Sequence, residues 1–130
     1  MITYHDIQEY CLSKPGSYKA CPFGPFPICF KIGNRIFLEW YPDDEKITLR
    51  CEPLLADFYR RSYPGIVIPG YHCPDRQKPY KNTVYLNREI KDSLVYDMLD
   101  HSYEEAVKSL KKKERIELRL IETNGWSKVK

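Results

Sequence analysis

The sequence predicts an α+β domain, and three observations lead to this fold class. Residues 28–51 alternate apolar and polar side chains in three short runs separated by turn residues, as in an antiparallel sheet. Helical patterns flank these runs, at residues 3–13, at residues 53–62 and again from residue 87 onwards. The 130 residues are enough for one hydrophobic core without a disulfide or a metal. We therefore expect a single compact α+β unit.

The first elements are marked by a helix start and by a proline-rich break. Thr3 and Asp6 have the spacing of a capping box, in which each side chain satisfies a backbone amide at the start of a helix. Residues 18–21 have the pattern of a short edge strand. Three prolines within residues 22–27 remove too many backbone donors for regular structure there. We expect an irregular connection before the sheet.

The predicted sheet is a meander of three strands. Residues 28–32 and 35–41 are joined by Gly33-Asn34, a two-residue sequence typical of a tight hairpin turn. A polar turn follows, and residues 47–51 alternate again as a third strand. Such a meander has one apolar face that must be covered by helices.

A second helix is predicted to begin at Pro53, because proline is favoured in the first turn of a helix. Its expected buried stripe consists of Leu54, Leu55 and Phe58, with Arg60 and Arg61 outside.

Residues 63–86 combine rigid turns with polar side chains. Pro64-Gly65 and Pro69-Gly70 each predict a turn, with a short extended segment between them. Residues 73–81 read as a polar loop, and residues 83–86 as a returning strand. This segment is expected to act as a scaffold that presents a basic loop.

The C-terminal third is predicted to be helical in two pieces. Asn87 is expected to cap the first piece, and Ser102 with Glu105 has capping-box spacing for a second start. Lys111–Lys113 suit a helix C-terminus, where cations meet the negative end of the dipole. We divide the chain into a domain of residues 1–113 and a C-terminal extension of residues 114–130, helical at first and then loose.

The net charge and the cysteine content argue against a dedicated nucleic-acid-binding domain and against a secreted protein. The net charge is only +3, and all of the excess lies in residues 71–130. This is less than the basic footprint of a dedicated nucleic-acid-binding domain. The five cysteines are odd in number and include no CxxC pair, and the first residues lack the apolar stretch of a signal peptide. We predict a cytoplasmic protein with reduced thiols, no metal, no cofactor and no membrane contact.

Seven short motifs stand out along the chain. The motifs are Pro22-Phe23-Gly24, Phe30-Lys31-Ile32-Gly33, Leu49-Arg50-Cys51-Glu52-Pro53, Tyr63-Pro64-Gly65, Pro69-Gly70-Tyr71-His72, Asn82-Thr83-Val84-Tyr85-Leu86 and His101-Ser102-Tyr103. Taken in this order, the motifs resemble those of the MmcQ/YjbR family of small bacterial proteins, and the resemblance covers about residues 3–113, most of the chain.

The resemblance implies an antiparallel sheet with N- and C-terminal helices packed on one face, as in CyaY, the bacterial frataxin. It also implies a DNA-binding label, attached to the family by structural analogy, which is an associational argument. Two departures fall in one loop. Lys81 stands where the family pattern usually has Trp, and the loop between His72 and Asn82 looks longer than usual.

Basic side chains provide the candidate nucleic-acid site. Cations neutralise phosphates while an aromatic ring stacks on a base or sugar. The candidates are Arg76, Lys78, Tyr80 and Lys81 in the loop and Lys111, Lys112, Lys113 and Arg115 at the predicted helix end. The alternative is a solvated loop and an ordinary basic helix end. Lys31, Arg35 and Arg50 on neighbouring strands form a second cationic group, for which a solvent-exposed or edge-guarding role is the alternative.

No set of residues has the pattern of a catalytic site. His72 with Tyr71, Asn82 and His101 comes nearest. The alternative is structural, since His72, Asn82 and His101 can serve a turn, a strand start and a helix break. The expected structural motif is Pro64, Gly65, Gly70, Tyr71, His72, Asn82 and His101. The sequence thus predicts a non-enzymatic module that binds DNA weakly and with low specificity. The alternative is a protein-interaction or small-ligand module that uses the surface around Tyr71, Tyr80 and Tyr85.

Overall fold

The structure is a computed structural model that describes residues 2–119, apart from the side chain of Asp44. Its centre is a six-stranded antiparallel sheet in the order β1-β2-β3-β4-β6-β5. The strands are β1 (Ser17–Ala20), β2 (Ile28–Ile32), β3 (Arg35–Tyr41), β4 (Lys46–Arg50), β5 (Val67–Pro69) and β6 (Lys81–Tyr85).

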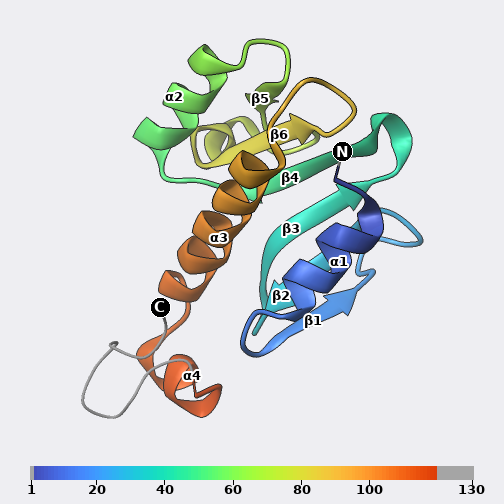
Figure 1. Cartoon of the computed structure of the whole chain (residues 1–130). Helices are drawn as coiled ribbons and strands as arrows, with labels where there is room; N and C mark the ends of the chain where they lie inside the picture. Colours follow the sequence, from blue (N-terminus) through green and yellow to red (C-terminus); the bar gives the residue numbers. More distant parts are fainter. Residues whose placement is uncertain (1, 120–130) are drawn as a thin grey trace.

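Helices α1 (Tyr4–Leu12), α2 (Pro53–Ser62) and α3 (Asp92–Lys108) cover one face of this sheet. The short helix α4 (Lys112–Glu117) lies beyond the end of α3 (Figure 1), and η1 (Asp43–Glu45) and η2 (Asp75–Tyr80) are short 3-10 turns. Figure 1 shows α1 and α3 in front of the sheet, with α2 beside β5 and β6. We call the face under α1 and α3 the proximal face and the opposite one the distal face. The predicted fold class, an α+β domain with terminal helices on one face of an antiparallel sheet, is confirmed.

The core lies between the proximal face and the helices. Phe30, Ile47 and Val84 from the sheet are fully buried with Ile7 of α1 and Leu99 of α3. Burial of side chains of this size stabilises a fold by roughly 1.5–3 kcal/mol each. This core is apolar enough to hold the two terminal helices on the sheet.

A bulge in β3 enlarges the proximal face. The register with β2 shifts after the pair Phe30 and Leu38, so that Phe37 has no partner of its own. Phe37 and Leu38 are both buried, and the Phe37 ring meets Tyr103 of α3 edge-on, with centroids 5.3 Å apart. A bulge bends the strand and increases its twist. Here it places two consecutive side chains in the core.

Most predicted elements are present within a residue or two of their expected bounds. The Thr3–Asp6 capping box is formed, Gly33 has the positive φ of a hairpin turn, and Pro53 starts α2. The turn at Pro64-Gly65 is present, with Gly65 at φ 78°. The second turn falls at Tyr71-His72, because Pro69 is still part of β5.

The predicted buried stripe of α2 is wrong. Leu54 and Phe58 are 81% and 60% exposed, whereas Ala56 is fully buried. Arg60, predicted to lie outside, turns inward and donates to the carbonyls of Lys78 and Lys81 and to the side chain of Asn82. The helix packs on β5, β6 and η2, and β6 and η2 offer the acceptors that draw Arg60 inward. Hydrophobicity alone therefore selects the wrong face.

The predicted break near Ser102 is also wrong, since α3 runs without interruption from Asp92 to Lys108 and starts five residues after Asn87. Ser102 is buried in the middle of the helix, where its hydroxyl donates to Phe37 O and accepts from the Arg50 amide. Its side chain serves the sheet and not a helix start. Lys111–Lys113, expected at a helix C-terminus, instead lie at the N-terminus of α4. The predicted loose end of the extension lies outside the described residues.

Candidate functional site

The distal face carries the side chains that alternate with the core. Neighbouring residues of a strand point to opposite faces. The residues that alternate with the core residues along each strand therefore project away from α1 and α3. This face carries Lys31 of β2, Glu39 and Tyr41 of β3, Lys46, Thr48 and Arg50 of β4, and Lys81, Thr83 and Tyr85 of β6. Charged and hydroxyl groups are therefore gathered on one side of the sheet.

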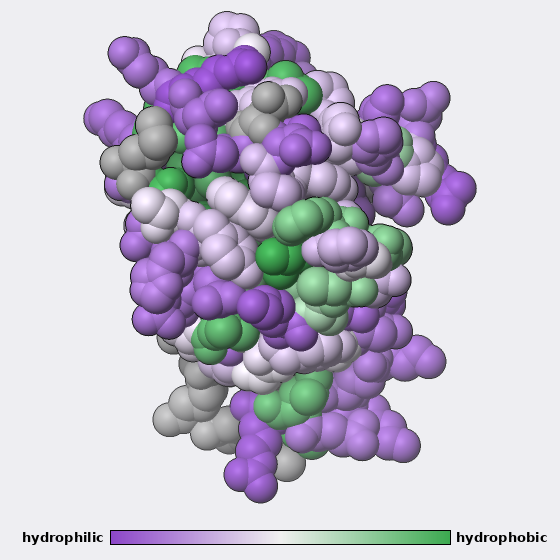
Figure 2. All heavy atoms as spheres, turned by 90° about the vertical axis from the view of Figure 1, so that its right-hand side faces the viewer, coloured by the Kyte–Doolittle hydropathy of each residue, from purple (hydrophilic) through white to green (hydrophobic). Residues whose placement is uncertain are grey.

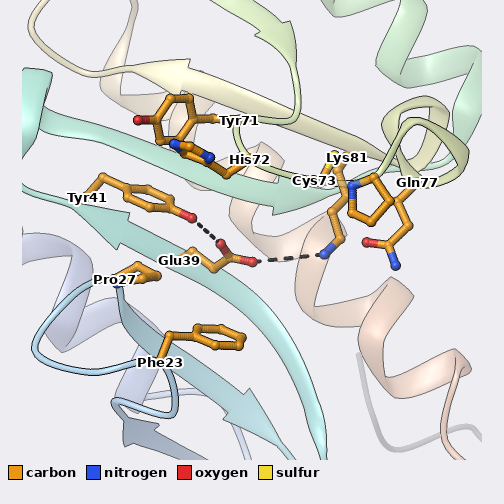
Figure 3. A pocket seen from close by; sticks show the side chains of 10 residues that line it. Phe23, Pro27, Glu39, Tyr41, Tyr71, His72, Cys73, Gln77 and Lys81 are labelled. Atoms are coloured by element: carbon orange, nitrogen blue, oxygen red, sulfur yellow. Dashed lines mark hydrogen bonds and ion pairs between the residues drawn. The ribbon is translucent and has the colours of Figure 1, made fainter.

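The first hollow on this face is lined mostly by rings, and we call it the aromatic hollow. It has a volume of about 400 Å³. The lining side chains are Phe23, Pro27, Glu39, Tyr41, Tyr71, His72, Cys73, Pro74, Gln77 and Lys81. Figure 3 shows them around one space, with Phe23 and Pro27 on one side and Tyr71 and His72 on the other.

A carboxylate beside a cation lies within the aromatic hollow. Glu39 accepts a hydrogen bond of 2.6 Å from the Tyr41 hydroxyl, and its other oxygen lies 3.9 Å from Lys81 Nζ (Figure 3). Burial, and secondly the bond to Glu39, raise the pKa of Tyr41. Tyr41 therefore stays a neutral donor, and the Glu39 carboxylate keeps acceptor sites on both oxygens.

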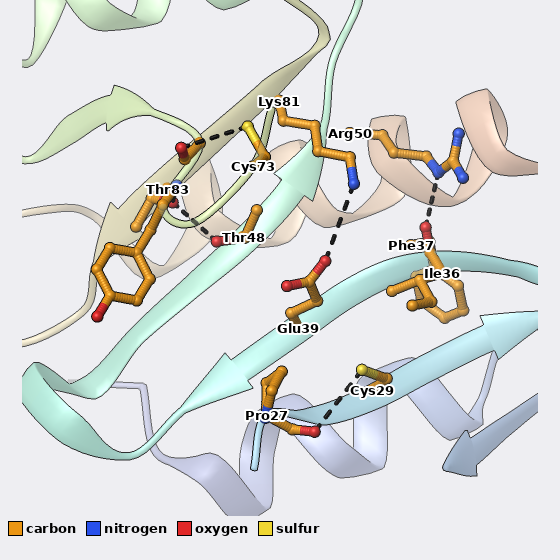
Figure 4. Close-up of polar contacts among 12 residues, drawn as sticks. Pro27, Cys29, Ile36, Phe37, Glu39, Thr48, Arg50, Cys73, Lys81 and Thr83 are labelled. Carbon is orange, nitrogen blue, oxygen red and sulfur yellow. Dashed lines mark hydrogen bonds and ion pairs between the residues drawn. The ribbon is translucent and has the colours of Figure 1, made fainter. Parts of the chain in front are cut away.

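Tyr71 is held in place by a chain of polar contacts. Its amide donates to Thr83 Oγ1 at 2.8 Å, and Thr83 shares a 2.8 Å hydrogen bond with Thr48 (Figure 4). Lys46 Nζ lies 4.0 Å from the centre of the Tyr71 ring, whose edge meets Tyr41. A cation at this distance is favoured by the negative face of the ring. The aromatic wall is thus rigidly placed.

The turn that carries Tyr71 and His72 depends on Gly70. A Cβ at Gly70 would lie 2.7 Å from Cys73 Sγ and 3.0 Å from Lys81 Cβ, so no larger residue fits. The Gly70 amide donates to Lys81 O, and its carbonyl accepts from the Cys73 thiol. His72 adopts φ 54°, which is uncommon for a residue with a side chain. This packing fixes the entrance of the hollow.

The second hollow, of about 420 Å³, lies beside the first, and we call it the cationic hollow. It shares Gln77 and Lys81 with the aromatic hollow. Its other lining residues are Arg35, Arg50, Cys51, Tyr80, Glu105 and Ser109. The two hollows therefore adjoin, and the cationic hollow extends from the distal face to the C-terminal end of α3.

Two guanidinium groups lie close together in the cationic hollow. Burial lowers the pKa of Arg50, and the nearby charge of Arg35 lowers it further, although Glu105 and Glu39 act against this. Arg50 Nε donates to Ile36 O at 2.6 Å, and Arg35 Nη2 donates to Ser109 O at 3.2 Å. Arg35 Nε is buried and has no hydrogen-bond partner among the described residues. A buried donor that makes no hydrogen bond is costly, and so is the repulsion between two guanidinium groups. An anion bound beside them would reduce both costs.

The predicted basic loop is η2 with the first residue of β6, and part of its charge is neutralised locally. Lys78 Nζ lies 3.1 Å from Asp75, and Lys81 lies near Glu39. Arg76 is exposed, and the Tyr80 ring is 56% exposed at the edge of the cationic hollow. The loop thus places an aromatic ring and Lys81 at the hollow, with less free charge than the sequence suggests.

The second predicted group of cations starts close to the same hollow. Ser109 lines it, and Lys111 follows two residues later as the N-cap of α4. Lys111, Lys112 and Lys113 are exposed, and Arg115 is half-buried. The start of α4 and the basic loop therefore approach the cationic hollow from two sides.

Asn82 and His101 serve the scaffold. Asn82 is buried, accepts from Arg60 Nε at 2.6 Å and donates to Ala56 O, which joins β6 to α2. His101 lies in the middle of α3, where Nε2 accepts from the Glu52 amide at 3.0 Å. Both point away from His72, which lines the aromatic hollow. The three residues do not form a cluster.

Sequence reasoning missed Glu39, Tyr41, Gln77 and Phe23 as parts of a hollow. A carboxylate within the apolar run Ile36–Tyr41, two residues before Tyr41 on the same face, was the available signal. The sequence predicts Arg35 and Arg50, together with Lys31, only as a cationic sheet face and not as part of a hollow. Within the part of the chain that the structure describes, no group of three or more His, Cys, Asp or Glu is placed to hold a metal ion. In the same part, no helix combines the length and hydropathy needed to cross a membrane.

Comparison with known proteins gives a consistent result. The YjbR family model matches residues 12–105. The uncharacterized protein YjbR of Escherichia coli K12 is 27% identical over 116 residues, which cover 88% of this chain and 95% of that protein. The uncharacterized protein YbdF of Escherichia coli O157:H7 is 33% identical over 121 residues, covering 89% and 93%.

Solved structures share the fold. A Deinococcus radiodurans protein, DR2400, described as a DUF419 domain, superposes with a TM-score of 0.84 at 28% identity, covering 98% of this chain and 96% of that one. A Pseudomonas syringae protein has a TM-score of 0.67 at 17% identity, covering 81% and 99%, which supports the fold alone. The family match, the relatives and the shared fold cover the same elements that form the two hollows. This chain belongs to the YjbR family.

Proposed function

We propose that this protein is a non-enzymatic module that binds DNA weakly and with low sequence specificity, along the distal face and the adjoining C-terminal end of α3. The observation that carries the proposal is the cationic hollow, where Arg35 and Arg50 lie together and Arg35 Nε has no described hydrogen-bond partner. Guanidinium groups bind phosphate oxygens through paired N–H donors. A phosphate in this hollow would satisfy the buried donor and offset the repulsion.

The surroundings of the hollow suit a backbone of repeating phosphates. Lys81 lies within it, Arg76 and Lys78 lie in η2 on one side, and Lys111–Lys113 begin α4 on the other. Tyr80 is exposed at the edge, where a ring can stack on a base or sugar. Contacts to phosphates position a nucleic acid without reading its sequence, so low specificity is expected.

A binding role is favoured over catalysis because the polar candidates for chemistry are apart. His72 lines the aromatic hollow, while Asn82 and His101 are engaged by Arg60 and the Glu52 amide. General acid–base catalysis needs groups that converge on one reacting atom. The proposed module therefore has no catalytic residue.

The test is the salt dependence of binding to a fluorescent duplex, measured by anisotropy at micromolar protein. We expect clear binding near 50 mM salt and a steep loss by about 200 mM, because each neutralised phosphate releases counterions. Arg35→Gln and Arg50→Gln should each weaken binding by about tenfold and lower the salt slope by roughly one unit. Arg61→Gln is the matched control, since this exposed arginine on α2 pairs with Asp57 away from the hollow.

Two results would contradict the proposal. One is the absence of salt-sensitive binding near 50 mM salt. The other is an equal loss of binding in the Arg50→Gln and Arg61→Gln proteins, which would mean that only overall charge matters.

A second candidate is a module for a small ligand or another protein on the tyrosine-rich surface. It is favoured by the aromatic hollow, where Tyr71 is fixed by Lys46 and Thr83. Tyr80 lines the neighbouring hollow, and Tyr85 carries Arg88 over its ring at 4.2 Å. This candidate predicts binding that survives Lys78→Glu with Lys81→Glu and is lost in Tyr71→Ala.

A further inference from the structure

We propose that the aromatic hollow receives one unpaired base of a nucleic-acid strand whose phosphate lies in the cationic hollow. This inference rests on the proposed DNA binding and adds a preference for single strands over duplexes. It is based on the chemistry of the aromatic hollow, on its junction with the cationic hollow and on an exposed ring at its rim.

The aromatic hollow suits a flat ring. Tyr41, Tyr71 and His72 lie along one side and Phe23 across from them (Figure 3). Its volume of about 400 Å³ falls in the range of ligand pockets, about 300–1,000 Å³. Bases stack on aromatic side chains whatever their identity, since every base has a π face. The lining therefore favours a planar heterocycle over a flexible chain.

The polar groups of the hollow match the edge of a base. Glu39 offers a carboxylate acceptor, and Lys81 offers an ammonium donor 3.9 Å away. Base edges present the complementary pair, because amino donors lie next to carbonyl or ring-nitrogen acceptors. Opposite charges side by side leave the hollow without net charge, which suits a neutral base and disfavours a second phosphate. Hydrogen bonding would thus hold the base by its edge.

Because the two hollows adjoin, a base in the aromatic hollow can have its own phosphate in the cationic hollow. Gln77 and Lys81 line both, so a ligand can occupy the aromatic hollow and reach Arg35 and Arg50 without leaving the surface. A nucleotide unit has this design, a neutral flat ring followed by an anion. In a duplex the same base is stacked and paired, and it would first have to leave the helix. Single strands are therefore favoured.

The rim of the aromatic hollow is unusually apolar for a surface. Phe23 is 66% exposed although it lines the hollow, and Figure 2 shows apolar side chains gathered over the loop between β1 and β2. An exposed aromatic ring beside a hollow is typical of a stacking platform, which is covered when its ligand binds. Phe23 is the side chain that a bound base would cover.

The experiment compares three ligands at one salt concentration: a single-stranded oligonucleotide that cannot pair with itself, the same strand in a duplex, and a free mononucleotide. Binding of the two oligonucleotides is measured by fluorescence anisotropy, and binding of the mononucleotide by competition. We expect the single strand to bind about tenfold more tightly than the duplex. Phe23→Ala should remove most of this preference and leave duplex binding unchanged. Phe58→Ala is the matched control, because Phe58 is similarly exposed, at 60%, on α2.

The outcomes separate this inference from the proposed function. Equal binding of strand and duplex, unaffected by Phe23→Ala but weakened by Arg50→Gln, would overturn the base site and leave DNA binding intact. If a free mononucleotide binds as tightly as the strand, the base in the hollow comes from a free nucleotide, and the proposal of a bound strand is overturned. If neither nucleic acid binds in a salt-dependent way, the DNA proposal itself is overturned.

Discussion

The two faces of the sheet use polar side chains in opposite ways. On the proximal face, Asn82 and Ser102 are buried and each makes two hydrogen bonds to the protein. In the two hollows, Arg35 keeps a buried donor without a described partner, and Glu39 of the distal face meets Lys81 only at 3.9 Å. Polar groups whose donors and acceptors are satisfied inside the protein stabilise the fold, whereas groups with unsatisfied donors or acceptors are available to bind a ligand.

The difference is sharpest within single strands. In β6, Asn82 turns to α2 while Thr83, the next residue, turns to Tyr71 and Thr48. In β4, the Arg50 amide bonds to Ser102 under α3, and the Arg50 side chain lines the cationic hollow. Stability and binding can therefore be changed separately by substitutions one residue apart.

The largest expected effect is on the proximal face, at Asn82. Asn82→Ala leaves Arg60 Nε without its acceptor and Ala56 O without its donor, so we expect a loss of about 2–3 kcal/mol in the free energy of unfolding. Urea denaturation measures this loss. DNA binding by the folded variant should stay within about twofold of the parent protein. A fall in affinity as large as that of Arg50→Gln would show that the two faces are not separable.

A medium effect is expected from Tyr103, which is buried between α3 and the bulge of β3. Burial raises the pKa of Tyr103 to about 12. Above the ordinary value of about 10 the unfolded chain loses the phenolic proton first, so stability is full below pH 10 and falls as pH rises towards 12.

Denaturation at pH 9 and at pH 11 measures this loss, and the share of Tyr103 is on the order of 1 kcal/mol for the pH step. Tyr103→Phe should therefore lose less stability than the parent protein over the same step, by about this amount. An identical loss in both proteins would assign the alkaline sensitivity to other groups, of which Cys29, Cys51 and Tyr10, each with a pKa raised to about 12 mainly by burial, are the candidates.

The smallest effect on stability is expected on the distal face, at Lys81. Lys81→Gln removes only a 3.9 Å contact with Glu39, so unfolding should change by less than about 0.5 kcal/mol. DNA affinity should nevertheless fall several-fold, because this cation lies in both hollows. A large destabilisation without loss of affinity would reverse the roles assigned to the two faces.

Local patterns predicted the elements well, and packing decided the exceptions. The Thr3–Asp6 box, the Gly33 hairpin and the α2 start at Pro53 depend on neighbours in sequence, and all three are formed. The inward face of α2 depends on the acceptors that Arg60 finds in η2 and β6, about twenty residues away. Ser102 looked like a helix start because its distant partners, Phe37 O and the Arg50 amide, are invisible in the sequence.

The sequence predicted several basic and aromatic residues of the candidate site, but it did not predict the hollows that they border. Lys81, Tyr80 and the start of α4 were identified as basic or aromatic positions, and they border the cationic hollow. The pairing of Lys78 with Asp75 and of Lys81 with Glu39 lowers the free charge of the predicted loop. Glu39 and Phe23 belong to segments far from that loop, so nothing in its own sequence indicated them.

The sequence by itself determined the strands, the turns and the family, because alternation, glycine turns and short motifs are properties of neighbouring residues. It also determined which side chains of β4 and β6 share a face, since that parity has a period of two, whereas the bulge at Phe37 breaks this parity in β3. Only the tertiary structure decided that Phe23, Glu39, Tyr71 and Lys81 surround one hollow and that Arg35 and Arg50 share another. A hollow is made by segments that meet across the sheet, and their meeting depends on the packing of the whole core.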